Sequence, residues 1–402
     1  MRRVIIGFVV IILIGCLAYG GYLGYQRYQE LEKIRNAKVE ITYKEDLTLE
    51  WNSDARTSDF IESINGQIVE DNKINTKKLG KQTINYEFVN DDGIRLKQSY
   101  EVEVVDKTAP LIWLGKSRSI AVGSKDTLVD DVLCGDNLDS NPKCYIEGEY
   151  DLNKVGEYSL VFKAEDKYGN TNEQPFTLKV YKPSGGGSSS SKTTYKKYAD
   201  LVAQYKKDNT KIGIDISEWQ DYPDYDKLKE AGVEFVIIRV GFTKGREGDY
   251  FIDKSFEHNI KEANRVGIPA GVYFFSYATS KEKAKENALW VLDKIKGYKI
   301  DLPISFDWEN WGKFNQYHIS FYELQQMADT FIDTVEEAGY KGMNYGSKTY
   351  LENMWLDTTG TIWLAHYTEE TGYKGEYKFW QRCDNALVPG ISGPVDVNIM
   401  YE

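Results

Sequence analysis

The chain has 402 residues, which is too long for one ordinary domain, so roughly two to four folded units are expected. Charged residues make up 28% and hydrophobic residues 41%, a composition typical of globular proteins. The formal net charge of −12 argues against a nucleic-acid partner, because no basic excess is present to neutralise phosphates. It also disfavours electrostatic attraction to anionic polymers.

Potential metal ligands are scarce. The chain has 3 His and 4 Cys, and none of them stands in a CxxC or HExxH arrangement. We therefore expect chemistry that needs neither a metal nor another cofactor. Asp136, Asn137 and Asp139 form an acidic cluster, but turn formation explains these residue types, and no metal is assigned to them.

The N-terminal segment is apolar. Residues 4–25 carry no charge and are long enough to cross a bilayer as a helix, and Arg2 and Arg3 before them predict that residues 1–3 stay in the cytoplasm. This arrangement gives a single-pass membrane anchor with the later domains outside the cell. A cleaved signal peptide is less favoured, because its apolar core would be shorter. LIGC, ending at Cys16, resembles a lipobox, so a lipoprotein anchor is the second alternative.

Short alternating runs such as QTINYEFV and YSLVFKAE follow, separated by Gly, Asn and Asp turns. A repeat at an offset of 76 positions aligns Gly80 with Gly156 and Val104 with Val180. It predicts two consecutive all-β sandwiches, over residues 38–106 and 107–182. The pattern resembles the bacterial immunoglobulin-like repeats that form stalks on surface proteins.

Two further features concern the second sandwich and its end. Cys134 and Cys144 lie close in sequence, in a compartment where thiols oxidise, so a local disulfide is expected, with two reduced thiols as the alternative. Cys383 has no obvious partner and is expected to be a buried free thiol. The Gly/Ser-rich residues 183–194 predict a flexible linker and a domain boundary.

Residues 195–402 predict an irregular β/α barrel. Apolar strands alternate there with amphipathic helical segments, which is typical of parallel β/α folds. The candidate strands, eight in number as a closed barrel requires, are KIGIDIS, FVIIRVGF, IPAGVYFFSY, LPISFDWE, GMNYGS, TIWLAHY, YKFWQR and PVDVNI. Between Thr361 and Ile399 three strands follow one another too closely for intervening helices. Helices are therefore expected to be missing on the closing side.

A pair of carboxylates falls at the end of one predicted strand. In ISFDWEN, Asp307 and Glu309 share strand parity, so both point to one face with Cα atoms about 6 to 7 Å apart. Two neighbouring carboxylates cannot both ionise freely, so one pKa rises and that group can act as a general acid. Glycoside hydrolysis needs such a pair. Solvated strand-end acids are the alternative, which the apolar surroundings make less attractive.

Two further acids are expected at the same end of the barrel. Asp215 in GIDIS and Asp396 in PVDVN have apolar neighbours of the opposite parity, which predicts that both point inward. Four acids would then converge on one barrel mouth. Taken singly, each of them is also explained as a helix cap or a turn former.

The motifs GIDIS, EWQ, GVYFFSYA, FDWEN, MNYGS, IWLAHY, FWQ and DVN resemble, in this order, those of glycoside hydrolase family 25, lysozymes of the N-acetylmuramidase type. The resemblance covers about residues 211–402. It implies cleavage of the β-1,4 bond between N-acetylmuramic acid and N-acetylglucosamine in peptidoglycan strands. It further implies that Glu309 is the proton donor and that Asp307 stabilises positive charge or positions the N-acetyl group. Asp215 and Asp396 would orient these groups and tune their pKa values.

Aromatic residues in the strand motifs are candidates for stacking on sugar rings, with core packing as the alternative. They are Tyr273, Tyr345, Trp363, Tyr367 and Trp380. His366 stands where family members often carry Gln, a departure that bears on substrate contacts. A chitinase-like glycosidase with a DxE strand motif and a non-catalytic wall-binding or adhesion protein are the rival functions. GIDIS and DVN argue against the first, and the presence of all four acids argues against the second.

Overall fold

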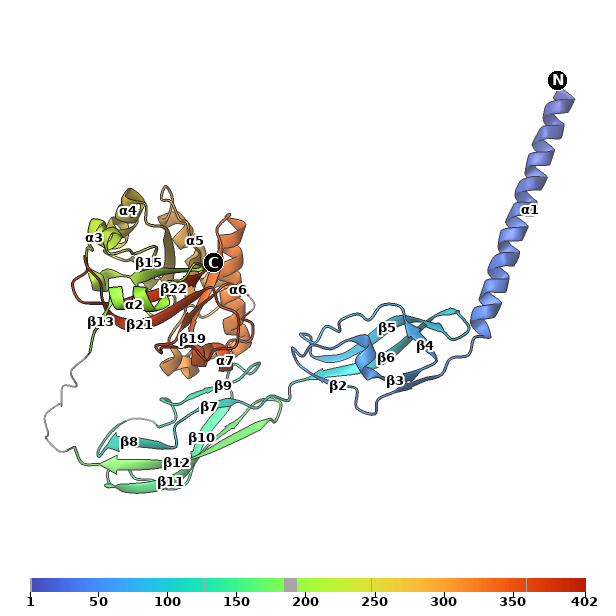
Figure 1. Cartoon of the computed structure of the whole chain (residues 1–402). Helices are drawn as coiled ribbons and strands as arrows, with labels where there is room; N and C mark the ends of the chain where they lie inside the picture. Colours follow the sequence, from blue (N-terminus) through green and yellow to red (C-terminus); the bar gives the residue numbers. More distant parts are fainter. Residues whose placement is uncertain (1, 126–127, 184–193, 247, 359) are drawn as a thin grey trace. The chain divides into compact units, whose positions relative to one another are not determined.

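The protein is described from a computed structural model, shown in Figure 1. It covers residues 2–125, 128–183, 194–246, 248–358 and 360–402, with the backbone alone for residues 2–14. The chain forms two compact units, Met1–Thr108 and Ala109–Glu402. Nearly all of the predicted linker, residues 184–193, lies outside the described residues. The finer division into domains stays a prediction.

The N-terminal helix corrects the expected anchor. Helix α1 spans Arg2–Arg35. Within the residues whose side chains are described, no helix is long and apolar enough to cross a bilayer. The prediction of a transmembrane helix over residues 4–25, and with it the membrane partner and the single-pass localisation, is therefore wrong. From residue 15 onward the helix is rich in Gly and Tyr and then becomes highly charged, while side chains 4–14 lie outside the described set.

The first β region comprises strands β1 to β6. Its main sheet has the order β2-β6-β5-β4, and β1 pairs separately with β3. The bounds are Ile41–Tyr43 (β1), Thr48–Glu50 (β2), Ile61–Ile64 (β3), Gly66–Ile68 (β4), Gly80–Asn90 (β5) and Arg95–Val105 (β6), with a short helix η1 at Thr57–Phe60. Phe88, Val102 and Val104 are buried because alternate residues of the β5–β6 hairpin face the same side.

The second β region comprises strands β7 to β12. Its main sheet has the order β10-β11-β12-β8, and β7 pairs with β9. The bounds are Leu111–Trp113 (β7), Ser117–Ala121 (β8), Leu133–Gly135 (β9), Lys143–Glu147 (β10), Gly156–Glu165 (β11) and Thr171–Tyr181 (β12). Phe162, Leu178 and Cys134 belong to its buried core. A disulfide joins Cys134 to Cys144.

The expected pair of immunoglobulin-like sandwiches is also corrected. In the parts described, each region has a sheet of four strands and a sheet of two, whereas an immunoglobulin domain has about seven strands, in sheets of four and three. Alternating polarity revealed the strands but does not specify how many of them pair. The main hairpins do recur at the offset of the sequence repeat, because Gly80 pairs with Val104 and Gly156 pairs with Val180.

The barrel region follows from residue 194. In the described residues eight strands close into a ring in the order β14-β15-β17-β18-β19-β20-β21-β22, with β22 antiparallel to both β14 and β21. Their bounds are Thr210–Ile216 (β14), Val236–Thr243 (β15), Ala270–Phe275 (β17), Ile304–Asp307 (β18), Gly342–Ser347 (β19), Ile362–Ala365 (β20), Phe379–Leu387 (β21) and Pro394–Tyr401 (β22). The short strands β13 (Lys196–Lys197) and β16 (Tyr250–Ile252) pair with β21 and β15.

Helices follow most barrel strands, but not the closing ones. Residues 366–378 and 388–393, all of them described, contain no helix, so the closing side is irregular. The helices are α2 (Tyr198–Tyr205), η2 (Glu218–Gln220), α3 (Tyr225–Glu230), α4 (Phe256–Val266), α5 (Lys281–Lys294), η3 (Trp311–Tyr317), α6 (Phe321–Glu337) and α7 (Lys348–Asn353). Ser320 starts α6 with a capping box, since it exchanges hydrogen bonds with Glu323.

Strand parity divides the apolar residues of the barrel into two cores. Ile214 and Ile216 join a large buried cluster that includes helix residues such as Leu324. Ile237 and Tyr345 belong to a second cluster, formed by residues of the opposite strand parity. Polar residues that share this second parity, at the strand ends, therefore face the barrel mouth.

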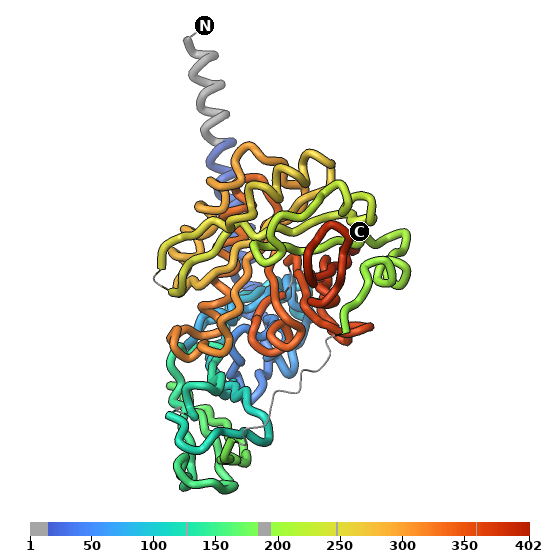
Figure 2. The backbone as a smooth tube through the Cα atoms, turned by 90° about the vertical axis from the view of Figure 1, so that its left-hand side faces the viewer, coloured from blue at the N-terminus to red at the C-terminus, as the bar shows by residue number. Residues whose placement is uncertain are grey.

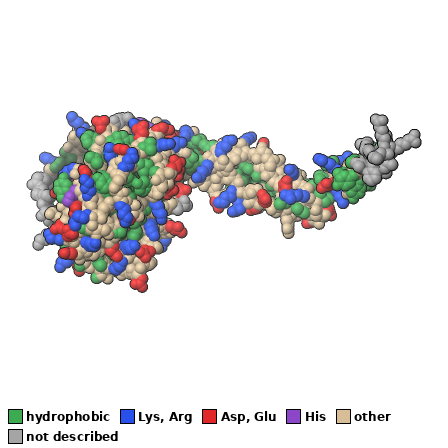
Figure 3. Space-filling model, turned by 90° about the horizontal axis from the view of Figure 1, so that it is seen from above, with side chains coloured by type: hydrophobic (Ala, Val, Ile, Leu, Met, Phe, Trp, Pro, Cys, Tyr) green, Lys and Arg blue, Asp and Glu red, His purple; other side chains and the backbone are tan. Residues whose placement is uncertain are grey.

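The end of the chain closes against the start of the barrel. The backbone N–H of Glu402 donates to the carbonyl oxygen of Asn209, 3.0 Å away, just before β14 begins. Figure 2 shows the C-terminus on the barrel. Acidic and basic side chains are interspersed on the face shown in Figure 3, so the net negative charge is not gathered there into one patch.

Candidate active site

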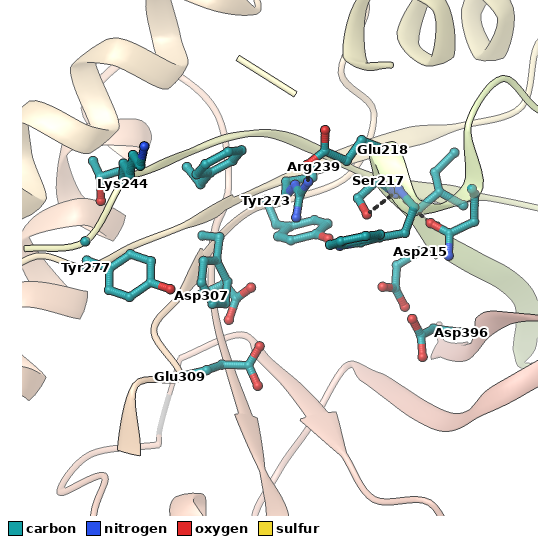
Figure 4. Close-up of a pocket in the computed structure, with 17 residues that line it drawn as sticks. Asp215, Ser217, Glu218, Arg239, Lys244, Tyr273, Tyr277, Asp307, Glu309 and Asp396 are labelled. Atoms are coloured by element: carbon teal, nitrogen blue, oxygen red, sulfur yellow. Dashed lines mark hydrogen bonds and ion pairs between the residues drawn. The ribbon is translucent and has the colours of Figure 1, made fainter. Parts of the chain in front are cut away.

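The predicted acids meet in a cavity of about 500 Å³ at the barrel mouth. Asp215, Asp307, Glu309 and Asp396 all line it. Figure 4 shows Asp215 and Asp396 facing each other on one side of the cavity, with Asp307 and Glu309 on the other. A second cavity of about 350 Å³ lies on another side of Glu309, which lines both. A chain-like ligand that occupied both cavities would therefore pass Glu309.

Asp307 and Glu309 differ in their exposure. Asp307 ends β18 with 4% of its surface exposed, and its Oδ1 has no hydrogen-bond partner among the described residues. Glu309 is exposed toward the cavities, two residues later. Burial raises the pKa of Asp307 well above its ordinary value, and the adjacent Glu309 raises it further. Partial desolvation in the recess also raises the pKa of Glu309.

Asp215 and Asp396 are directly opposite each other on the antiparallel strands β14 and β22. Asp215 Oδ2 accepts hydrogen bonds from Gln381 Nε2 at 2.9 Å and from Asn398 Nδ2 at 2.7 Å. Burial raises the pKa of Asp215 to about 6, and these hydrogen bonds oppose the rise. Burial, with the charge of Asp215, raises the pKa of Asp396 to about 9.

An arginine lies on the wall of the first cavity. Arg239, on β15, forms ion pairs with Glu218 at 2.9 Å and with Asp253 at 2.8 Å. Asp253 Oδ2 also accepts the backbone N–H of Glu218 at 2.9 Å, so this network fixes the start of η2. The Arg239 charge lowers the pKa of Asp307, but burial and Glu309 outweigh it.

Three of the five predicted aromatic residues line the cavities. Tyr273 lines the first, and Tyr345 and Tyr367 line the second. The hydroxyl groups of Tyr345 and Tyr367 both donate to Gln381 Oε1, at 2.9 and 3.0 Å. Gln381 therefore connects the tyrosines of the second cavity to Asp215.

The two predicted tryptophans line neither cavity. Trp363 is 2% exposed, and its Nε1 donates to Asn398 Oδ1 at 2.7 Å. Trp380 is 4% exposed, and its Nε1 donates to the carbonyl oxygen of His366 at 2.9 Å. Trp363 thus supports a residue that holds Asp215, and Trp380 belongs to the large helix-facing core. Neither offers a face to a sugar ring.

Several residues of the site were not singled out from the sequence. Trp219, 79% exposed, and Tyr277 line the first cavity, and Lys348 lines the second, next to His366, whose bearing on substrate contacts the sequence did indicate. Trp219 stands in EWQ, Gln381 in FWQ and Asn398 in DVN, so the motif order contained the signal without a role for each residue. Arg239 was detectable as a charge inside the apolar run FVIIRVGF, because buried charges are normally paired.

Comparison with known proteins places this region in a family context. Residues 214–391 match the model of glycosyl hydrolases family 25. "Uncharacterized protein YegX" of Escherichia coli K12 is 28% identical over 193 residues, which cover 46% of this chain and 68% of that protein. Lysozyme M1 of Streptomyces globisporus is 28% identical over 206 residues, covering 46% of this chain and 66% of that one.

Among solved structures, the modular autolysin LytC from Streptococcus pneumoniae, in complex with a synthetic peptidoglycan ligand, is 27% identical with a TM-score of 0.43. The match covers 60% of this chain and 56% of that one. The chain therefore spans little more than half the length of that autolysin.

Proposed function

We propose that the chain, a glycoside hydrolase whose residues 214–391 match the model of glycosyl hydrolases family 25, cleaves peptidoglycan as an N-acetylmuramidase. The scissile bond joins N-acetylmuramic acid to N-acetylglucosamine through a β-1,4 linkage. The observation that supports this proposal most directly is the position of Glu309, whose carboxyl lines both cavities. A glycan that runs through both cavities would present a glycosidic oxygen to it.

Glu309 is proposed as the general acid. Its raised pKa keeps a proton available at a higher pH than an ordinary glutamate would. Transfer of that proton to the glycosidic oxygen breaks the bond to the sugar ring and leaves positive charge on that ring. Exposure toward the cavities gives the carboxyl access to the leaving oxygen.

Asp307 is proposed to stabilise that positive charge, or to position the N-acetyl group beside it. Its Oδ1 is buried and has no partner in the described residues, so a ligand can supply one. The ionisations of Asp307 and Glu309 depend on each other, because the charge of Glu309 raises the pKa of Asp307, whereas hydrogen bonding with Asp307 lowers the pKa of Glu309. Positive charge on the sugar ring favours a charged Asp307, which leaves the proton on Glu309.

The remaining groups of the site are proposed to hold this arrangement. Asp215, which accepts hydrogen bonds from Gln381 and Asn398, and Asp396 would tune the pKa values. Tyr273, Tyr345 and Tyr367, together with Trp219, would contact the sugars.

The deciding experiment treats purified peptidoglycan with the full chain and identifies the products by reducing-sugar release and mass spectrometry. We expect products that end in reducing N-acetylmuramic acid. Glu309→Gln should lower kcat by roughly 10²- to 10⁴-fold, because the glutamine cannot donate the proton.

Glu376→Gln makes the same chemical change at an exposed residue outside both cavities, and it should retain the parental rate. Products that end in reducing N-acetylglucosamine would contradict the assigned bond. Absence of any product from the parent would leave a wall-binding protein, and a Glu309→Gln variant as active as the parent would remove Glu309 from its role.

A further inference from the structure

The second β region touches the barrel beside the segment that carries Glu309. Its docking segment, residues 132–141, includes β9 and the loop that follows it, and β9 lies next to the barrel in Figure 1. Asn315, on η3, donates from Nδ2 to the Val132 carbonyl at 2.8 Å and accepts the Cys134 N–H at 3.0 Å. One side chain of the barrel thus satisfies two backbone groups of the docking segment.

The start of helix α6 adds more contacts. The first backbone N–H groups of a helix have no partner within the helix. Here the N–H of Phe321 donates to the Asp136 carbonyl at 2.8 Å, and the N–H of Tyr322 donates to the Asn137 carbonyl at 3.1 Å. The docking segment therefore completes a helix end that the barrel would otherwise leave to solvent.

The apolar contact is equally close. Leu133 is 8% exposed and belongs to the core cluster of the barrel. Gly135 packs so tightly that an added Cβ would lie 2.8 Å from ring atoms of both Phe314 and Phe321. Real Cβ atoms do not approach other atoms so closely, so the aromatic rings would have to move. The contact leaves no space for even one methyl group.

These rings lead directly to the catalytic strand end. Phe314 lies 6.0 Å from Trp308 between ring centroids, and Trp308 also meets Trp311 and Tyr317, each at 5.0 Å. Trp308 stands between the two proposed catalytic acids in the chain and is 1% exposed. Close-packed rings transmit displacement, because interiors contain little free volume.

We infer that the docking segment, through Asn315 and the rings of η3, holds the Glu309-bearing segment in its catalytic position. The second β region is then a fixed part of the hydrolase, not only a spacer. This inference rests on the proposed function for its catalytic consequence. Asn315 and Gly135 act through other residues, so they are positioning residues.

The test compares Gly135→Ala with Gly115→Ala, both in the full chain. Gly115 belongs to the same β region, but a Cβ there would have its nearest heavy atom at 3.7 Å, which is ordinary contact. Two readouts are taken well below the onset of thermal unfolding: amide hydrogen exchange over residues 310–322, and kcat and KM on soluble peptidoglycan strands. Exchange reports the contact itself, and the kinetic pair reports its effect on chemistry.

We expect Gly135→Ala, but not Gly115→Ala, to exchange faster over residues 310–322. Its kcat should fall roughly 10- to 100-fold, with KM changed by less than about twofold. Asn315→Ala should behave in the same way. Asn315→Asp keeps the acceptor for the Cys134 N–H but loses the donor to Val132. Its exchange rate and kcat should lie between those of Asn315→Ala and the parent.

Parental exchange over residues 310–322 in Gly135→Ala would overturn the inference. So would faster exchange together with a parental kcat, because the contact would then be structural only. If the parent cleaves no glycan at all, the proposed function fails by that result. Faster exchange in Gly135→Ala and not in Gly115→Ala would still support the inference that the docking segment fixes the Glu309-bearing segment.

Discussion

Asp396 is a residue of the site whose burial lowers the free energy of unfolding of the barrel at neutral pH. Its pKa in the folded protein, about 9, lies above the ordinary value of 3.8, so folding favours the protonated form. The stability contribution of this group is fully present below pH about 4 and is lost as the pH rises toward 9. At pH 7, which lies between these two values, most of this contribution to the free energy of unfolding is therefore already lost.

Replacing Asp396 with Asn should accordingly stabilise the barrel at pH 7, by about 1 to 2 kcal/mol after allowance for solvent screening. Calorimetric melting of the barrel transition at pH 7 and at pH 4 checks this expectation, since the gain should vanish at pH 4. Asp208→Asn, the same chemical change at an exposed residue outside the site, should gain nothing at either pH. Equal stability of Asp396→Asn and parent at pH 7 would contradict the burial cost.

Asp215 gives a prediction for the pH dependence of activity. The charge of Asp215 raises the pKa of Glu309. As the proposed general acid Glu309 must be protonated, so we expect activity to be lost as the pH rises through that pKa. Asp215→Asn keeps an oxygen that can accept from Gln381 and Asn398 but removes the charge. The basic limb of kcat/KM should therefore move to lower pH. A limb that stays or moves upward would refute the electrostatic role of Asp215.

Among the elements, the short helix η2 carries the most exposed aromatic side chain of the first cavity. Trp219 is 79% exposed and lines this cavity, so its ring is accessible for stacking on a sugar. Trp219→Ala should raise KM by roughly three- to tenfold with little change in kcat, because stacking is worth about 0.5–1.5 kcal/mol beyond area burial. Trp113→Ala, at an exposed position in β7, should leave both constants unchanged. A fall in kcat alone would exclude simple stacking.

The elements also show what could be predicted from sequence. The barrel strands carry strong apolar runs, and strand parity separates Asp215 from Ile214 and Ile216, so strands and inward acids were both predictable. Parity does not distinguish the wall of a cavity from the core beneath it, which is why Trp363 was a candidate although it is buried. Trp380 has the opposite, helix-facing parity, so parity argues against it as a cavity residue. In the two β regions the strands themselves were predictable, but their pairing was not, because alternating polarity does not specify which strands pair.

The contact between the second β region and the barrel could not be predicted from the sequence. Asn315 lies 181 positions from Cys134 in the chain, and the residues around neither of them indicate that the two form a hydrogen bond. At Gly135 the rings of Phe314 and Phe321 leave no space for a side chain, a constraint that no local sequence pattern indicates. The N-terminal segment differs from its prediction for another reason: its uncharged length predicts an anchor, but from residue 15 onward the helix is rich in Gly and Tyr.

For the molecule as a whole, the net charge of −12 predicts how salt affects its action on walls. Anionic wall polymers repel such a protein, and the Debye length falls from about 30 Å at 0.01 M salt to about 8 Å at 0.15 M. Release of products from intact anionic walls should therefore quicken over this range, while cleavage of short neutral fragments should not. Turbidity and reducing-sugar assays on the two substrates check this. Slower wall lysis at higher salt would indicate a cationic binding surface instead.

The closure of the barrel by β22 has a consequence for biosynthesis. Asn398, which donates to Asp215, comes from a strand 183 positions later in the chain, and β22 also supplies Asp396 and the antiparallel partner of β14. A ribosome that has made all other barrel strands has thus produced Asp307 and Glu309 but an open ring. Unfinished chains would lack a complete site. The proposed peptidoglycan hydrolase activity would therefore arise only once β22 has been synthesised and has closed the ring.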